Sequence, residues 1–237
     1  YFLAGILIIL FNITDVPAAI LTIVQSAFGL KAAAGGALGA MVVAMQKGIA
    51  RGIFSNEAGL GSAPIAAAAA QTKEPVRQGL VSMTGTFIDT ILICTMTGLS
   101  IVLTGAWQVE GLEGVQVTTY AFQHGLPFPA QFSSFILMLC LVFFAFTTIL
   151  GWDYYSERCL EYLSGGNMKH VKIFRWIYIL AVFIGPYMTV SAVWTIADIF
   201  NGLMALPNLI AVTALSGVVV AETKVYMDGL KKDKIQP

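Results

Sequence analysis

One polar stretch decides the fold: Gly52-Ile-Phe-Ser-Asn-Glu-Ala-Gly-Leu-Gly-Ser-Ala-Pro64, which separates two apolar segments too short to be ordinary membrane spans. Non-helical backbone survives at membrane depth only inside protein or along a watery cavity, because every N–H and C=O needs a partner there. An ionisable residue at such a break, here Glu57, indicates a functional site. Interrupted apolar segments also mark the binding sites of transporters. We therefore expect a substrate to bind at this break.

The composition indicates a membrane protein. Of the 237 residues, 57% are hydrophobic and 11% are charged, whereas soluble proteins carry about 25% charged residues. Thirteen basic residues balance thirteen acidic ones, so a nucleic acid is not an expected partner. Four uncharged gaps each hold roughly the 20 residues that a spanning helix needs: 90–109, 114–152, 176–197 and 199–221.

These gaps predict an all-α integral membrane domain over residues 1–237 with about five spans. Residues 1–11 are expected to end a preceding helix, and 18–28 to form a short interfacial helix. The predicted spans are 33–53, broken near 54–62 and resumed over 63–71, then 76–104, 128–154, 174–191 and 193–221. The last is either one helix kinked at Pro207 or two segments. We favour one kinked helix, because 193–205 is too short to cross alone.

Lys and Arg in the connecting segments predict the orientation. Basic residues occupy 71–79, 156–175 and the tail from Lys224, whereas 105–127 contains two glutamates and no basic residue. The basic segments are expected on the cytoplasmic side and 105–127 outside. Because the chain begins at Tyr1, inside an apolar run and without an initiator methionine, we expect it to be part of a longer protein.

Three segments, Ala33-Ala-Gly-Gly-Ala37, Gly48–Ala66 around the break and Asn201-Gly-Leu-Met-Ala-Leu-Pro-Asn-Leu-Ile210, resemble the signature of the alanine/glycine:cation symporter family. The resemblance implies an inner-membrane protein of bacteria or archaea that imports alanine or glycine with sodium, or in some cases with protons. It also implies a LeuT-type fold of two inverted five-helix repeats. This chain resembles the second repeat with the end of the preceding helix, and the first repeat, which supplies half of the site, is absent.

The break supplies the candidate substrate residues. In the fold implied by the resemblance, a half-helix N-terminus faces the substrate carboxylate and unwound carbonyls bind sodium. Gly59 and Gly61 let backbone approach closely, and Ser55 and Asn56 add the oxygen ligands that hard cations prefer. The alternative is a plain helix kink packed by glycines.

Two aromatic residues are candidates for the substrate side-chain pocket. Trp152 lies one helical turn beyond Thr148, and the resemblance implies that it lines this pocket while Phe54 closes it from the break. Simple core packing of both rings is the alternative.

The candidate cation ligands are Ser55, Asp89, Thr147 and Thr148. Adjacent threonines in an apolar helix usually bond back to carbonyls four residues earlier, whereas the resemblance implies that a hydroxyl pair at this position ligates sodium. Asp89 lies inside a predicted span, either as a cation ligand or as a hydrogen-bonded buried acid.

Two charged residues are candidates for coupling or gating. Glu57 is a cation ligand, a protonatable group or a structural acceptor for N–H groups that the break frees. Arg51 shares a helix face with Lys47, and a charge at mid-bilayer costs about 2.5–3.5 kcal/mol. Both are therefore expected to face an outer vestibule or to pair with a carboxylate, such as Glu57 for Arg51. One face of the last predicted span either serves an outer gate or packs the bundle: Trp194, Asp198 and Asn201.

The sequence as a whole predicts a sodium-coupled symporter for a small neutral amino acid, in the plasma membrane and without a cofactor. Proton coupling and a channel-like or structural membrane subunit are the alternatives. An enzyme is not expected, since the sequence offers no Ser/His pair, no His-x-x-x-His and no metal-binding cluster.

Overall fold

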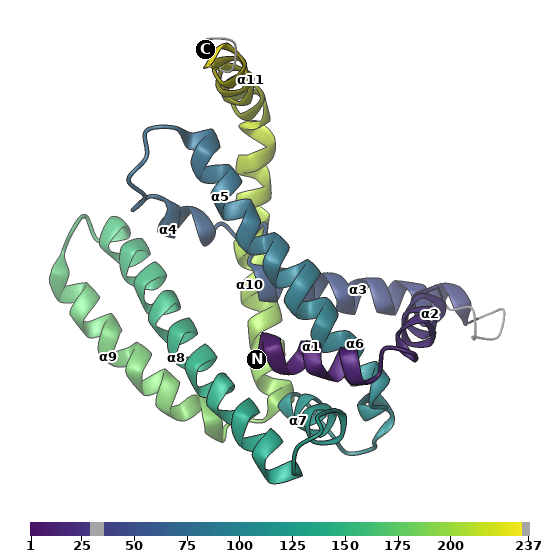
Figure 1. Ribbon diagram of the computed structural model, residues 1–237. Helices are drawn as coiled ribbons and strands as arrows, with labels where there is room; N and C mark the ends of the chain where they lie inside the picture. The colour runs from purple at the N-terminus through teal and green to yellow at the C-terminus, as the bar shows by residue number, and fades with distance from the viewer. Residues whose placement is uncertain (29–35, 234–237) are drawn as a thin grey trace.

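The computed structural model describes residues 1–28 and 36–233, and every regular element in these ranges is helical, as predicted (Figure 1). Residues 33–35, which belong to the first predicted span and to one motif, lie outside the described residues. The elements are α1 (Phe2–Phe11), α2 (Val16–Ala27), α3 (Ala37–Asn56), α4 (Ala63–Ala67), α5 (Pro75–Phe87), the π-helix η1 (Ile88–Cys94), α6 (Thr95–Leu103), η2 (Ala106–Gln108), α7 (Val115–Gly125), α8 (Ala130–Leu163), α9 (Met168–Ile184), η3 (Gly185–Tyr187), α10 (Val190–Ala214) and α11 (Ser216–Asp233).

Fewer helices than predicted have the length and composition of a membrane span. Among the described residues, the continuous helix from α5 to α6, α8 and α10 meet both conditions, in agreement with three predicted spans. The bent pair of α1 and α2, which turns through 104°, makes a fourth if it counts as one span. Helix α3 and the 17-residue helix α9 do not belong to this set. The described chain therefore has three or four candidate spans rather than five.

The preference for one kinked helix over 193–221 is wrong. Pro207 lies inside α10, which continues to Ala214, and α11 begins at Ser216. The junction falls beside Gly217, a poor helix former. With 25 residues, α10 is long enough to cross a membrane alone.

Helix α8 extends nine residues beyond the predicted end of its span, from 154 to 163. It stops where Gly165 and Gly166 adopt positive φ angles of 62° and 84°. The Gly166 N–H bonds to the Glu161 carbonyl at 2.8 Å and the Gly165 N–H to the Tyr162 carbonyl at 3.2 Å. This pair of bonds is the Schellman ending, which favours glycine because of its left-handed backbone.

The predicted outer loop 105–127 contains a helix, α7, which packs between α6 and α8. Its Phe122 joins Ile8 of α1, Leu126 and Leu137 of α8 in a small buried cluster. The N-terminal helix and this segment therefore form one packed unit at the end of α8.

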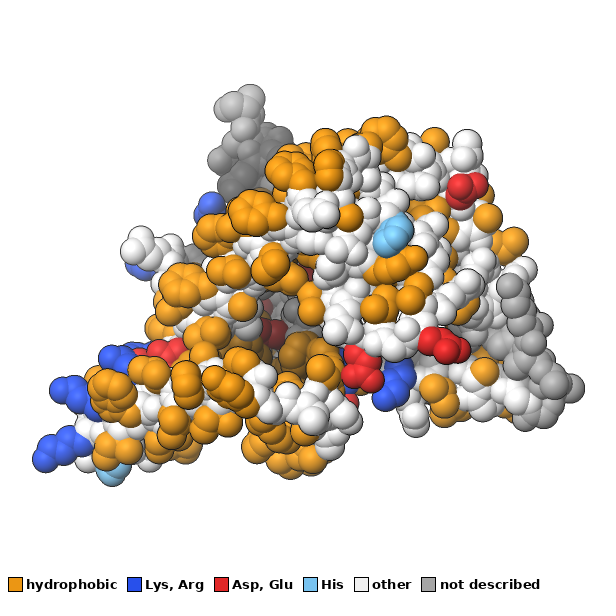
Figure 2. Space-filling view, turned by 90° about the horizontal axis from the view of Figure 1, so that it is seen from below, with side chains coloured by type: hydrophobic (Ala, Val, Ile, Leu, Met, Phe, Trp, Pro, Cys, Tyr) orange, Lys and Arg blue, Asp and Glu red, His pale blue; other side chains and the backbone are white. Residues whose placement is uncertain are grey.

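Most large apolar side chains of the described chain are exposed. No residue of α10 is buried, and apolar side chains cover much of the face shown in Figure 2, with carboxylates in and around a hollow near its middle. Extended apolar surface of this kind marks faces that meet lipid or further protein.

Candidate functional site

The predicted break lies between α3 and α4. Helix α3 ends at Asn56, and Glu57 follows in the left-handed region with φ of 55°, the one non-glycine residue with positive φ in the described ranges. Gly59 and Gly61 also have positive φ, at 86° and 81°. Left-handed backbone costs an L-residue about 1–2 kcal/mol, so this segment is held in place by its surroundings.

Side chains within the break hold its shape. The hydroxyl of Ser62, which is buried, donates to Glu57 Oε2 at 2.6 Å, and the neighbouring Leu60 is buried as well. Glu57 thus accepts a side-chain hydroxyl, whereas its predicted structural role was to accept freed backbone N–H groups, and its three predicted roles stay predictions. A Cβ at Gly61 would lie 3.1 Å from Oδ1 of Asn208, so the break also packs closely on α10.

Asn56 fastens the break to the π-helix. Its Nδ2 donates to Thr90 Oγ1 at 2.8 Å, and its Oδ1 accepts from the Ala58 N–H at 2.9 Å. The bond to the Ala58 N–H ends α3 locally, and the bond to Thr90 connects that end of α3 to η1. Both the side-chain nitrogen and the side-chain oxygen of Asn56 are thus hydrogen-bonded within the protein.

Ser55 and Asp89, two of the predicted cation ligands, are in direct contact. Ser55 Oγ donates to Asp89 Oδ2 at 2.7 Å and lies 3.6 Å from Cys94 Sγ. Asp89 is in the first turn of η1 and Cys94 is its last residue. π-helical turns occur frequently at functional sites, and here the turn brings a carboxylate to the end of the broken helix.

A cavity of about 640 Å³ adjoins this contact. Thr148 reaches it from α8 and Thr118 from α7, so elements far apart in the sequence meet around Ser55 and Asp89. Its volume is within the range of about 300–1,000 Å³ of small-molecule sites. The polar residues that line it are Tyr1, Ser55, Asp89, Thr97, Thr118 and Thr148.

The two threonines of α8 differ. Thr147 Oγ1 donates to the carbonyls of Phe143 and Phe144, both at 3.0 Å, which is the back-bonding alternative. Thr148 is the member of the pair that lines the cavity. The structure therefore brings three of the four predicted cation ligands to one place.

Arg51 joins α3 to α10. Its Nη2 donates to both carboxylate oxygens of Asp198, with 2.6 Å to Oδ2, and its guanidinium lies 3.9 Å from the centre of the Trp194 ring. The ring of Phe54 meets Trp194 edge to face, with 4.9 Å between centroids. The carboxylate that the sequence suggested for Arg51 was Glu57, but the structure pairs Arg51 with Asp198 instead.

Trp152 and Phe54 lie in separate aromatic contacts. Trp152 packs edge to face against Tyr155 of the same helix, with centroids 5.7 Å apart, whereas Phe54 packs against Trp194. A side-chain pocket shared by Trp152 and Phe54 stays a prediction.

Sequence reasoning missed several residues of the cavity. Tyr1 Oη lies 2.7 Å from Thr97 Oγ1, and Thr118 belongs to the predicted outer loop 105–127. A threonine inside an uncharged run was the available signal for Thr97, but such residues usually bond to their own helix, as Thr97 also does to the Ile93 carbonyl. The described residues contain no group of three or more His, Cys, Asp or Glu that could hold a metal ion.

Residues 1–237 match the family model described as the sodium:alanine symporter family. The chain belongs to this family. It is 57% identical over 232 residues to an uncharacterized transporter of Haemophilus influenzae, and 47% identical over 236 residues to the sodium/alanine symporter AgcS of Methanococcus maripaludis. Each alignment covers 98% of this chain and 50% of the relative. A probable sodium/glutamine symporter, GlnT of Bacillus subtilis, is 39% identical over 227 residues, which are 96% of this chain and 46% of that protein.

The family assignment confirms the resemblance that the sequence motifs indicated. The sodium:alanine symporter family is one of transporters, and with several apolar helices the chain is a multi-pass membrane protein of bacteria or archaea. The chain spans about half the length of the curated relatives it matches.

Proposed function

We propose that the full-length protein is a secondary active symporter that imports alanine or glycine together with sodium across the plasma membrane. One observation carries the proposal: Ser55, Asp89 and Thr148, whose side chains all carry oxygen, line a single cavity at the end of the broken helix. Hydroxyl and carboxylate oxygens are the donors that hard cations prefer. Asp89 would also balance the charge of a cation at membrane depth, where an unpaired charge is costly.

The proposed amino-acid site adjoins this cation site along the break. A Cβ at Gly59 would meet nothing within 4 Å, whereas one at Gly61 would meet Asn208. Gly59 thus leaves room for substrate beside the backbone, and Gly61 and Asn56 would shape the break through their own contacts. Phe54 and Trp152 remain the proposed limits on side-chain size.

We further propose that the chain is the second repeat of a LeuT-type fold. The length of the relatives and the exposed apolar faces support a second half that covers this one and contributes the rest of the site. Arg51 and Asp198 would then tie α3 to α10 beside the break and act as a gate.

The name of AgcS supports alanine as the substrate and sodium as the coupling ion. The relative named for glutamine is less similar to this chain. Because a family member carries that name, the assay should include glutamine as a competitor. Proton coupling through Asp89 is the alternative that the assay must separate, because acidic residues inside membranes also serve in proton relays.

The test is uptake of radiolabelled alanine by the full-length protein in proteoliposomes. An inward sodium gradient is expected to drive alanine above its outside concentration, and a pH gradient alone is not. Unlabelled glycine should compete better than glutamine. Uptake that only equilibrates would indicate a channel, and uptake driven by the pH gradient without sodium would overturn sodium coupling. Asp89→Asn tests the proposed cation site in the same assay. Glu110→Gln, an equivalent change in the outer loop, is its matched control.

A further inference from the structure

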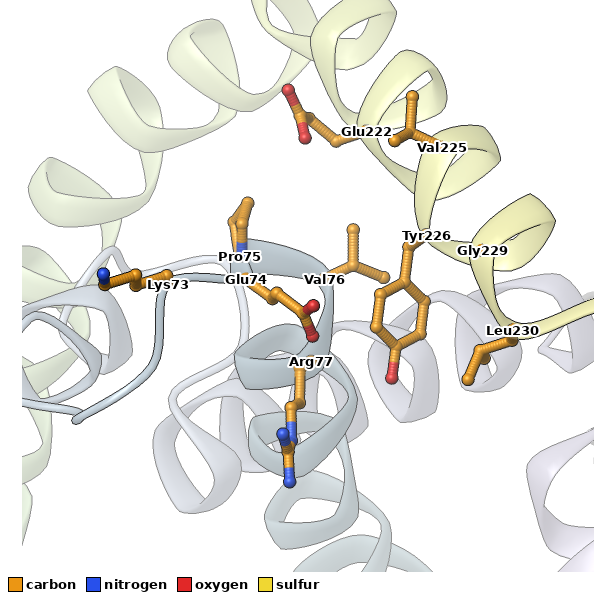
Figure 3. A pocket seen from close by; sticks show the side chains of 10 residues that line it. All are labelled: Lys73, Glu74, Pro75, Val76, Arg77, Glu222, Val225, Tyr226, Gly229 and Leu230. Atoms are coloured by element: carbon orange, nitrogen blue, oxygen red, sulfur yellow. The ribbon is translucent and has the colours of Figure 1, made fainter. Parts of the chain in front are cut away.

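A groove runs between the start of α5 and α11, away from the proposed transport site. It consists of two adjoining cavities of about 720 and 570 Å³ that share Pro75, Val76 and Glu222. Figure 3 shows Tyr226 of α11 beside the first turn of α5, with Glu74 and Arg77 extending from the α5 side. The groove is therefore formed by residues nearly 150 positions apart in sequence, such as Arg77 and Tyr226.

One end of the groove carries charges of both signs. Lys73 and Arg77 supply two positive groups, and Glu74 and Glu222 supply two negative ones. Within the described residues, none of these four side chains forms a hydrogen bond or an ion pair with another side chain. Opposite charges that line one cavity without pairing are available to a ligand that itself carries both signs.

The other end of the groove is apolar. It follows α5 from Pro75 to Met83, a length of about 12 Å at 1.5 Å per residue. Its apolar side chains are 45–60% exposed, and α5 at this point is the beginning of the candidate span Pro75–Leu103. The residues are Leu80, Met83, Leu215, Val218 and Val219.

We propose that this groove binds a phospholipid with a zwitterionic amine headgroup, phosphatidylethanolamine, in the cytoplasmic leaflet. Lys73 and Arg77 would bind the phosphate, and Glu74 and Glu222 would accept hydrogen bonds from the ammonium group. One acyl chain follows the apolar end into the bilayer. Tyr226, which also lines the groove, would then lie near the membrane interface, where aromatic side chains are enriched.

Charge complementarity selects this headgroup among common phospholipids. An anionic headgroup such as phosphatidylglycerol meets the two basic residues but is repelled by Glu74 and Glu222. A choline headgroup has no N–H to donate to a carboxylate. The basic segment 71–79 is on the predicted cytoplasmic side, which assigns the leaflet.

The test is lipid retention by the purified full-length protein, measured by native mass spectrometry in an equal mixture of phosphatidylethanolamine, phosphatidylglycerol and phosphatidylcholine. Wild type is expected to retain phosphatidylethanolamine preferentially. Lys73→Ala and Arg77→Ala should each reduce this retention about fivefold, since a basic residue near a lipid headgroup contributes about 1 kcal/mol. Glu222→Gln should shift the preference toward phosphatidylglycerol.

Lys224→Ala is the matched control, because Lys224 is on α11 but does not line the groove. Retention is counted as lipid bound per intact protein ion, so a loss of folded protein does not change it, and Arg77→Lys should keep the wild-type retention. Equal retention of the three lipids, a wild-type preference for phosphatidylglycerol, retention of phosphatidylethanolamine that is unchanged in both alanine variants, or a lipid ratio unchanged by Glu222→Gln would overturn the proposal. Lipid retention is measured without alanine or sodium transport, so it can be confirmed or refuted whether or not the protein proves to take up alanine.

Discussion

Replacing Gly61 with alanine tests whether the break is held against α10. Gly61 has φ of 81°, and an added Cβ would lie 3.1 Å from Asn208 Oδ1 and 3.3 Å from its Cγ. Gly59 provides a matched control: its φ is 86°, but the space around its missing Cβ is open to 4 Å. Alanine would have to adopt a positive φ at both positions, but only at Gly61 would its Cβ also crowd a neighbouring side chain.

The expected costs follow from these two terms. Left-handed backbone costs alanine about 1–2 kcal/mol at either glycine. Crowding against Asn208 adds about 1–3 kcal/mol at Gly61, the usual cost of an extra methyl group in a packed site. Gly61→Ala should therefore destabilise the protein more than Gly59→Ala. In an Asn208→Ala background the crowding disappears, and the cost of Gly61→Ala should fall to that of Gly59→Ala.

The assay is thermal unfolding of the full-length protein in detergent, with alanine uptake measured on the same preparations. The single variants and the double variant form a cycle that isolates the contact between Gly61 and Asn208. Equal destabilisation by Gly59→Ala and Gly61→Ala would refute the packing of the break on α10. So would a Gly61→Ala cost that is unchanged when Asn208 is shortened.

Three further outcomes follow from the site. Asp89→Asn should raise the sodium concentration for half-maximal alanine uptake, with recovery at high sodium; unchanged sodium dependence would remove Asp89 from the cation site. Thr148→Ala should raise it as well, whereas Thr147→Ala should not, because the Thr147 hydroxyl is bonded to its own helix; the opposite order in sodium titrations would contradict this. Asp198→Asn should weaken the half-exposed ion pair with Arg51 by about 1 kcal/mol or less, seen as a lower unfolding midpoint whose deficit shrinks at high salt.

The position of the break could be predicted because its cause is local. Glycines at 59 and 61 and a polar triplet before them cannot continue an apolar helix, whatever surrounds them. The partners of the break could not be predicted in the same way. Arg51 lies six residues from Glu57 in sequence but pairs with Asp198, since the ion pair depends on how α3 crosses α10.

Two further failures have physical causes. The segment 115–125 has no unbroken apolar run, and its helix depends on packing against α6 and α8 rather than on its own pattern. No proline or charged residue at Leu215 marks the end of α10 in the sequence. Pro207, which suggested a kink, lies inside α10 instead. Tertiary contacts therefore decide α7, which is where single-sequence patterns carry least information. At the end of α10 the local signal is Gly217, one glycine among 23 in the sequence.

The contacts of the break suggest how cation and substrate would be coupled. Ser55 and Asn56 hold it to η1 through Asp89 and Thr90, while Gly61 holds it to α10. A cation bound at Ser55 and Asp89 would fix the first of these contacts, and a substrate bound beside Gly59 would sit between the two. Each ligand would then stabilise the arrangement that the other binds, and such an effect on affinity is necessarily reciprocal. In this arrangement coupling requires no direct contact between sodium and amino acid, because the shared element is the unwound backbone itself.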